Sequence, residues 1–206
     1  MAGLEAAVRV FRAKGFRVTT LHDIAEEAGM SRAALYYYVG SKEQLFRDVV
    51  SAAVTANIAD AERVVAEDLP ADAKLARLIA LLMESFERHY PYLYVFVQED
   101  FSKLGGGTDS VSGSWEATIQ DWNKRYLDLV KQVVADGIAT GDLRTALPSG
   151  VVANCVIGMT NSSHAWFRPG GLMDAAEIGA GMARMILAGL RPDDPRGDRV
   201  RSRLVG

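Results

Sequence analysis

The sequence contains a single cysteine, Cys155, among its 206 residues. An internal disulfide cannot form, which excludes the disulfide-stapled scaffolds of small secreted proteins. No apolar run approaches the roughly 20 residues that a membrane-spanning helix requires. The opening residues, MAGLEAAVRVFRAKGF, lack the continuous apolar segment of a secretory signal. These absences favour a cytoplasmic protein with no membrane partner.

The motifs of common enzymes and metal sites are also missing. The histidines His22, His89 and His164 have no partners at metal-ligand spacing, and neither G-x-S-x-G nor G-x-G-x-x-G occurs. Cys155 lies among apolar residues, as small core cysteines do. We therefore expect a protein that is not an enzyme and that holds no cofactor or metal.

Strand-like alternation is rare, and most segments place apolar residues at the 3.6-residue period of a helix. Glycines and prolines mark where these helices end. We therefore predict an all-α fold of about nine helices. The expected helices cover residues up to 14, 21–28, 32–39, a long stretch from Ser41 to before Pro70, 71–90, a short segment after Pro91, 114–140, 148–167 and a last helix from Asp174 to Gly189, with a glycine- and serine-rich loop at 103–114.

Capping residues near the N-terminus predict three helix starts in close succession. Thr20 precedes Asp23 by three residues, and Ser41 precedes Gln44 by three, so each pair can form a capping box. Ser31 is placed to cap the helix between them. The segment from residue 20 to residue 45 is therefore expected to hold two short helices and the start of a long one.

The two short helices fit the helix-turn-helix pattern. Ala25 is small enough for the second helix to approach, and Gly29 supplies a turn in which a positive φ is favourable. The apolar positions expected to form the small core between the helices are Ile24, Ala28, Met30, Leu35 and Tyr38. In such units the second helix enters the major groove of DNA and presents its first residues to base edges.

The second helix, SRAALYYY, carries side chains suited to this task. Arg32 can hydrogen-bond guanine through two donors. Ala33 and Ala34 leave room for close approach or contact a thymine methyl group. Tyr36 and Tyr37 can donate hydroxyl groups to phosphates. This helix is therefore the predicted recognition helix.

Tyr38 and Lys42 extend the predicted contact surface. Tyr38 is suited equally to packing and to a phosphate contact, and Lys42, in the first turn of the next helix, can bind a phosphate beside free backbone N–H groups. Residues 1–47 contain seven basic and five acidic side chains, whereas the remainder is acidic. Ordinary surface variation also explains such an imbalance, but it is the asymmetry expected if only this part meets a polyanion.

The run TTLHDIAEEAGMSRAALYYYVGSKEQLFRDVV resembles the DNA-binding domain of the TetR family of bacterial repressors, over about residues 4–50. The resemblance implies a homodimer on a near-palindromic DNA operator and an all-helical C-terminal domain that binds a small molecule. His22 occupies a position where relatives often carry arginine. The candidate DNA-binding residues are Thr20, His22, Ser31, Arg32, Ala33, Tyr36, Tyr37, Tyr38 and Lys42.

The expected domains are a DNA-binding domain at 1–47, a ligand-binding and dimerisation domain at 48–190, and a disordered tail at 191–206. Aromatic and methionine side chains of the second domain are expected to line an apolar effector pocket, with core packing as the alternative for each. The candidate ligand-binding residues are Phe86, Tyr90, Phe96, Trp122, Arg125, Tyr126, Met159 and Trp166.

The segment GMTNSSHAWFRPGG, residues 158–171, is rich in small residues and suits a dimer seam formed by the last two helices of each subunit. Its ending resembles TetR-family members that sense acyl-coenzyme A thioesters, which implies a small hydrophobic effector of that class. The main hypothesis is therefore a ligand-responsive repressor. The alternatives are a helical lipid- or acyl-binding protein or enzyme without DNA affinity, and a DNA-binding protein that responds to no metabolite.

Overall fold

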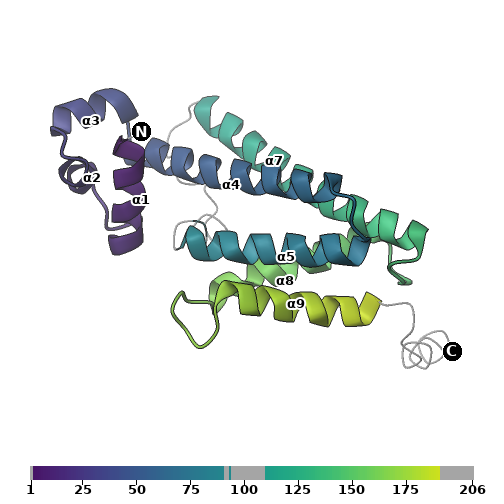
Figure 1. The fold of residues 1–206 in the computed structure, drawn as a ribbon. Coiled ribbons are helices and arrows are strands. Elements are labelled where there is room, and N and C mark those ends of the chain that lie inside the picture. The colour runs from purple at the N-terminus through teal and green to yellow at the C-terminus, as the bar shows by residue number, and fades with distance from the viewer. Residues whose placement is uncertain (1, 91–92, 94–109, 191–206) are drawn as a thin grey trace. The chain divides into compact units, whose positions relative to one another are not determined.

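The computed structural model describes residues 2–90, 93 and 110–190, apart from the side chains of residues 2, 38 and 110–114. Within these ranges the chain forms helices and no strand, which confirms the predicted all-α fold (Figure 1). The elements are α1 (Ala2–Lys14), α2 (Leu21–Glu27), α3 (Arg32–Val39), α4 (Lys42–Ala66), α5 (Ala71–Arg88), α7 (Ser110–Thr140), α8 (Ser149–Asn161), the 3₁₀ helix η2 (Ser162–Ala165) and α9 (Ala175–Leu190).

Some predicted elements cannot be compared with the structure. The short helix after Pro91, the loop at 103–109 and the tail at 191–206 lie outside the described residues. None of the helices in the described ranges is long and apolar enough to cross a membrane.

Two predicted boundaries are wrong, and a third agrees with the structure. The loop was expected to extend to residue 114, but α7 already begins at Ser110, because extending an existing helix costs far less than nucleating one. α4 ends at Ala66, before Pro70, as expected. The helix expected at 148–167 ends at Asn161 and gives way to η2.

The early end of α8 has a local cause. The Ser162 hydroxyl donates to the Met159 carbonyl at 2.7 Å, and His164 Nδ1 lies 2.7 Å from the Asn161 carbonyl oxygen. Such short polar side chains compete with the backbone for its own hydrogen-bonding groups, and a tighter 3₁₀ turn results. Hydrophobic periodicity alone does not report this competition.

The chain divides into two compact units. Unit 1 contains residues Met1–Asn57 and Ser85–Trp122, and unit 2 contains Ile58–Glu84 and Asn123–Gly206. The helices α4, α5 and α7 each contribute residues to both units. The domain boundary expected at residue 47 stays a prediction.

Unit 1 is built around a cluster of three phenylalanines that joins α1, the α1–α2 connection and α4. The ring centroid of Phe16 lies 4.4 Å from that of Phe46 and 5.6 Å from that of Phe11, and all three side chains are buried. Two ion pairs add surface links between α1 and α2: Arg9 with Glu27 at 2.6 Å, and Lys14 with Asp23 at 2.7 Å. The buried rings stabilise this unit more than the ion pairs do, because exposed ion pairs contribute little.

Unit 2 depends on close helix packing at two glycines. A Cβ atom at Gly179 of α9 would lie 3.1 Å from the Cα atom of Ala80 in α5. A Cβ atom at Gly137 of α7 would lie 2.5 Å from the Cβ atom of Ala71, at the start of α5. The Asp142 carboxylate accepts a hydrogen bond from the Ala71 amide at 3.2 Å, so the segment after α7 caps the N-terminus of α5.

We predict that Gly137→Ala lowers the free energy of unfolding by about 1–3 kcal/mol, because the added methyl group overpacks the contact with Ala71 and Leu143. Chemical denaturation measures the change. Gly150→Ala in α8 is the matched control, because a Cβ atom there meets nothing within 4 Å. The control is expected to be neutral or stabilising by about 0.5–1 kcal/mol. Equal stability of the Gly137 variant and wild type would contradict the packing described here.

Candidate functional site

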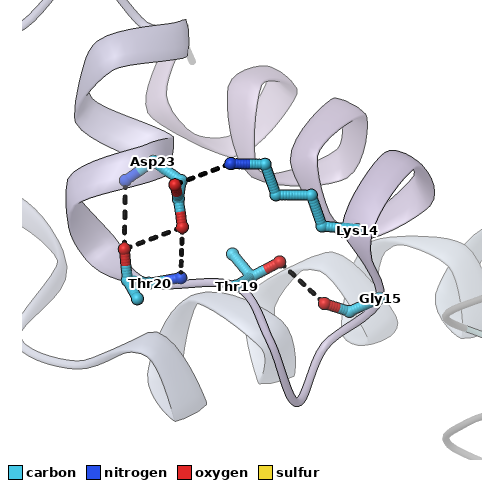
Figure 2. A network of polar contacts seen from close by, with 5 residues as sticks. All are labelled: Lys14, Gly15, Thr19, Thr20 and Asp23. Carbon is cyan, nitrogen blue, oxygen red and sulfur yellow. Dashed lines mark hydrogen bonds and ion pairs between the residues drawn. The ribbon is translucent and has the colours of Figure 1, made fainter.

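The start of α2 is held by a complete capping box (Figure 2). The Thr20 hydroxyl oxygen accepts from the Asp23 amide at 3.2 Å, and the Asp23 carboxylate accepts from the Thr20 amide at 2.8 Å. The ammonium of Lys14 in α1 donates to the same carboxylate at 2.7 Å, and the Thr19 hydroxyl donates to the Gly15 carbonyl at 2.7 Å. The predicted capping box is therefore confirmed. The hydrogen bond from Lys14 to the Asp23 carboxylate also joins α2 to α1.

The carboxyl group of Asp23 is electrostatically favoured as the anion. The hydrogen bond from Lys14 is the main cause, and the hydrogen bonds from Thr20 add to it, so the pKa of Asp23 lies well below its ordinary value of 3.8. Asp23 is therefore a carboxylate throughout the physiological pH range.

The turn and the helix after it follow the predicted spacing. Gly29 has a φ of +64°, and the Ser31 hydroxyl oxygen accepts from the Ala34 amide at 3.1 Å to cap α3. Ile24 and Leu35 of the predicted small core are buried, with 0% and 1% exposure. Ala25 is buried where the second helix approaches, Ala28 and Met30 are half-buried, and the side chain of Tyr38 lies outside the described residues.

The outer face of α3 carries exposed side chains of the predicted kind. Arg32, Ala33, Tyr36 and Tyr37 are all exposed, and Tyr37 is 85% exposed. The Arg32 guanidinium donates to the Tyr36 hydroxyl at 3.3 Å and lies 5.2 Å from the centre of its ring. Aromatic groups exposed on so short a helix, beside an arginine, are typical of a binding surface.

Beside α3 lies a notch of about 360 Å³ at the starts of α2 and α4, lined by Thr19, Thr20, Leu21, Tyr36, Gly40, Ser41, Lys42 and Glu43. It brings three predicted DNA-binding residues together, Thr20, Tyr36 and Lys42. Two other predicted DNA-binding residues, His22 and Ser31, are exposed to solvent. The Lys42 ammonium donates to the Phe16 carbonyl at 3.1 Å, which sequence reasoning did not anticipate.

The capping box predicted for α4 is only half right. The Ser41 hydroxyl oxygen accepts from the Gln44 amide at 2.9 Å, as expected. The Ser41 amide, however, donates to the Val39 carbonyl at 2.6 Å, and the Gln44 side chain donates to Asp48 at 2.8 Å. The turn at Gly40, with a φ of +64°, directs the Ser41 amide away from Gln44.

Three of the predicted ligand-binding residues that the structure describes, Phe86, Tyr90 and Trp122, belong to unit 1. Phe86 is buried, Tyr90 and Trp122 are half-buried, and Phe96 lies outside the described residues. The Trp122 ring packs edge-on against Trp115, with 5.4 Å between centroids.

A contact beside Phe86 was not expected from the sequence: Ser85 Oγ lies 3.1 Å from Nδ1 of His89. Burial, helped by the charge of Arg88, lowers the pKa of His89.

The other predicted ligand-binding residues belong to unit 2. Nε of Arg125 donates to Glu62 at 2.9 Å, so α7 is joined to α4 by an exposed ion pair. The Tyr126 hydroxyl donates to the Leu78 carbonyl at 3.5 Å, and desolvation raises the pKa of Tyr126 above its ordinary value of 10.0. Met159 and Trp166 both lie in a separate groove.

This groove has a volume of about 610 Å³ and is formed by α8, η2, α9 and the segment between them. Leu172 is fully exposed there, Met185 is 72% exposed and Trp166 is 53% exposed. Leu172 and the α9 methionines were not predicted, although Met182 and Met185 are three residues apart and so share a helix face. The lining residues are Met159, Ser162, Trp166, Phe167, Arg168, Gly171, Leu172, Met173, Glu177, Ile178, Gly181, Met182 and Met185.

Two known protein families together match most of the chain. Residues 4–49 match the family described as "Bacterial regulatory proteins, tetR family", and residues 68–190 match the "Tetracyclin repressor-like, C-terminal domain". The HTH-type transcriptional repressor KstR2 of Mycobacterium tuberculosis is 30% identical over 189 residues, which cover 91% of this chain and 90% of KstR2.

Solved structures share the fold. PfmR of Thermus thermophilus, a TetR family transcriptional regulator, superposes with a TM-score of 0.78 at 26% identity, covering 93% of this chain and 99% of that one. FadR of Bacillus subtilis, solved in complex with stearoyl-CoA, superposes with a TM-score of 0.70 at 19% identity, covering 92% of this chain and 98% of that one.

Replacing Asp23 tests the network at the start of α2. In Asp23→Asn the charge attraction to Lys14 is lost. Because the pKa of Asp23 is lowered in the folded state, its carboxylate stabilises the protein at pH values above 3.8, and this contribution shrinks as the pH falls below 3.8. The variant is therefore expected to melt below wild type between about pH 5 and 8.

Melting curves recorded as a function of pH measure this difference, which should begin to narrow as the pH falls below about 4 and keep narrowing with further acidification. Asp121→Asn, at an exposed position of α7, is the control and should melt like wild type. A gap that stays constant down to acid pH would show that the charge of Asp23 is not the cause.

Proposed function

The chain belongs to the TetR family of bacterial transcriptional regulators, and on this basis we propose that it is a cytoplasmic repressor that leaves its operator when a small hydrophobic effector binds. The observation that carries this proposal is the exposed face of α3, where Arg32, Tyr36 and Tyr37 have no role in the core. The similarity to KstR2, which is named as a repressor, supports repression as the outcome.

DNA is read by the face formed by α3 and the notch beside it. Arg32 forms two hydrogen bonds with guanine in the major groove, and Ala33 contacts the neighbouring base. Tyr36 and Tyr37 donate to phosphates and so set the register of α3 on the duplex, and Thr20 lies beside Tyr36 in the notch. These roles follow from the exposure and chemistry of the side chains.

The protein acts as a homodimer through α8 and α9. The groove on these helices exposes Trp166, Leu172 and Met185, and a monomer in water rarely leaves such large apolar side chains together. A second copy of the same surface would cover them in a symmetric, self-complementary interface. A dimer also places two α3 helices on one operator, which requires a spacing of about 34–36 Å.

The effector is an acyl-coenzyme A thioester. The same fold holds stearoyl-CoA in FadR. The apolar side chains of Phe86, Tyr90 and Trp122, which all belong to unit 1, suit an acyl chain. α4 runs without a break from unit 1 into unit 2, so an effector that favours a different position of α4 shifts the population away from the DNA-binding form.

Binding to the DNA upstream of the gene for this protein tests the proposal. The complex should survive excess competitor DNA, and its log affinity should fall by about 0.9 per phosphate contact for each unit of log salt. Acyl-coenzyme A thioesters added to that complex should release the DNA. Lipid binding without affinity for any DNA would instead favour the alternative of an acyl-binding protein.

Arg32→Ala is expected to weaken operator binding by about 5- to 150-fold, which corresponds to the roughly 1–3 kcal/mol of one bidentate base contact. Binding to random DNA should change much less, because that affinity comes from phosphates. Fluorescence anisotropy with both duplexes measures the two effects. The matched control is Arg77→Ala, an exposed arginine of α5 that bonds Glu67. Equal losses on operator and random DNA would contradict a base-reading role.

Met185→Lys is expected to convert the dimer to a monomer, because a charge would be buried at the centre of the proposed interface. Sedimentation velocity measures the change in mass. Ile138→Lys, an equivalent change at an exposed apolar position of α7 outside the groove, should leave the dimer intact. A Met185 variant that remains dimeric would place the interface elsewhere.

A further inference from the structure

Lys42 is the first residue of α4, and its side chain turns back onto the chain before α2. The ammonium donates to the Phe16 carbonyl at 3.1 Å and lies 3.5 Å from the Arg17 carbonyl oxygen. It also sits 4.6 Å from the centre of the Phe16 ring. The side chain is half-buried, so these contacts are partly screened from water.

Both carbonyl groups belong to the α1–α2 connection, residues 15–20, which carries the chain from the end of α1 to the cap of α2. The connection turns at Gly15, whose φ is +81°, and the Thr19 amide donates back to the Gly15 carbonyl at 3.3 Å. It ends at Thr20, the N-cap of α2. The place of α2 therefore depends on how firmly this connection is held.

α4 holds this connection from two successive turns. Lys42 binds the carbonyl groups and faces the ring of Phe16, while Phe46, four residues later, packs against the same ring with 4.4 Å between centroids. A lysine ammonium over an aromatic face, with carbonyl oxygens as acceptors, is a favourable site for a desolvated cation. Phe46 fixes where the ring lies, and Lys42 fixes where the backbone lies.

We propose that Lys42 is a positioning residue that acts on DNA through the α1–α2 connection, and not mainly by neutralising a phosphate. This inference rests on the proposed DNA-binding function and changes the role that the sequence suggests for Lys42. It also follows that a displacement of the start of α4 moves Phe16, Arg17 and, with them, the cap of α2. Lys42 thereby couples α4 to the surface that meets the operator.

Lys42→Met tests the proposal, because methionine keeps the apolar stem over Phe16 but removes the donors and the charge. We expect operator affinity to fall about tenfold, as for loss of a hydrogen bond to a charged group. The slope of log affinity against log salt should not change. The amides of Thr19 and Thr20 should exchange faster with deuterium in the free protein.

Lys131→Met is the matched control, since it removes the same charge from an exposed position of α7 and should change none of the three measurements. A phosphate contact predicts a different result: the magnitude of the salt slope falls by about 0.9 per lysine. That result, or unchanged exchange at Thr19 and Thr20, would overturn the proposal. A change in melting temperature alone, with affinity intact in the folded protein, would also overturn it.

If circular dichroism shows that Lys42→Met does not fold, Lys42→Arg takes its place. The guanidinium keeps the charge but is longer and planar, so it is not expected to reproduce the contacts that the compact ammonium makes with Phe16 and the two carbonyl groups. Reduced operator affinity with an unchanged salt slope supports positioning, and full affinity overturns it.

If the wild-type protein binds no DNA, the proposed function fails. Hydrogen exchange in Lys42→Met still decides whether Lys42 holds the α1–α2 connection.

Discussion

Two helices of seven and eight residues, α2 and α3, are too short to persist in water by themselves. They exist because their ends are capped and their inner sides are buried. The Thr20–Asp23 box and the Ser31 cap satisfy backbone N–H groups at the two starts, and Ile24 and Leu35 are almost completely buried. With this local support the outer face of α3 stays exposed, so its side chains are available for a ligand.

The same reliance on a few contacts underlies the role in DNA binding that we propose for the start of α4. α4 is a continuous helix of 25 residues that belongs to unit 1 at its start and to unit 2 at its end. At its start, Lys42 and Phe46 hold the connection that leads to α2. In the proposed mechanism, a small molecule that favours a different position of α4 therefore alters DNA binding without touching α3.

Features encoded by neighbouring residues could be predicted from the sequence. The cap at Thr20, the turn at Gly29 and the buried positions Ile24 and Leu35 all depend on spacings of three or four residues. Features that depend on residues far apart in the sequence could not be predicted from it. Lys42 meets a carbonyl 26 residues earlier in the chain, and Met185 shares its groove with Trp166 across the turn before α9. The end of α8 was missed for another reason, since it depends on side-chain competition that hydrophobic periodicity does not report.

Hydroxyl-radical footprinting on the DNA upstream of the gene tests the central claim most directly, which is that two copies of α3 read two half-sites. We expect two protected patches on one face of the duplex, centred about one helical turn or 10–10.5 base pairs apart. Both patches should disappear together when an effective acyl-coenzyme A thioester is added. A single patch, or uniform weak protection along the duplex, would contradict a dimeric reader of a palindromic operator.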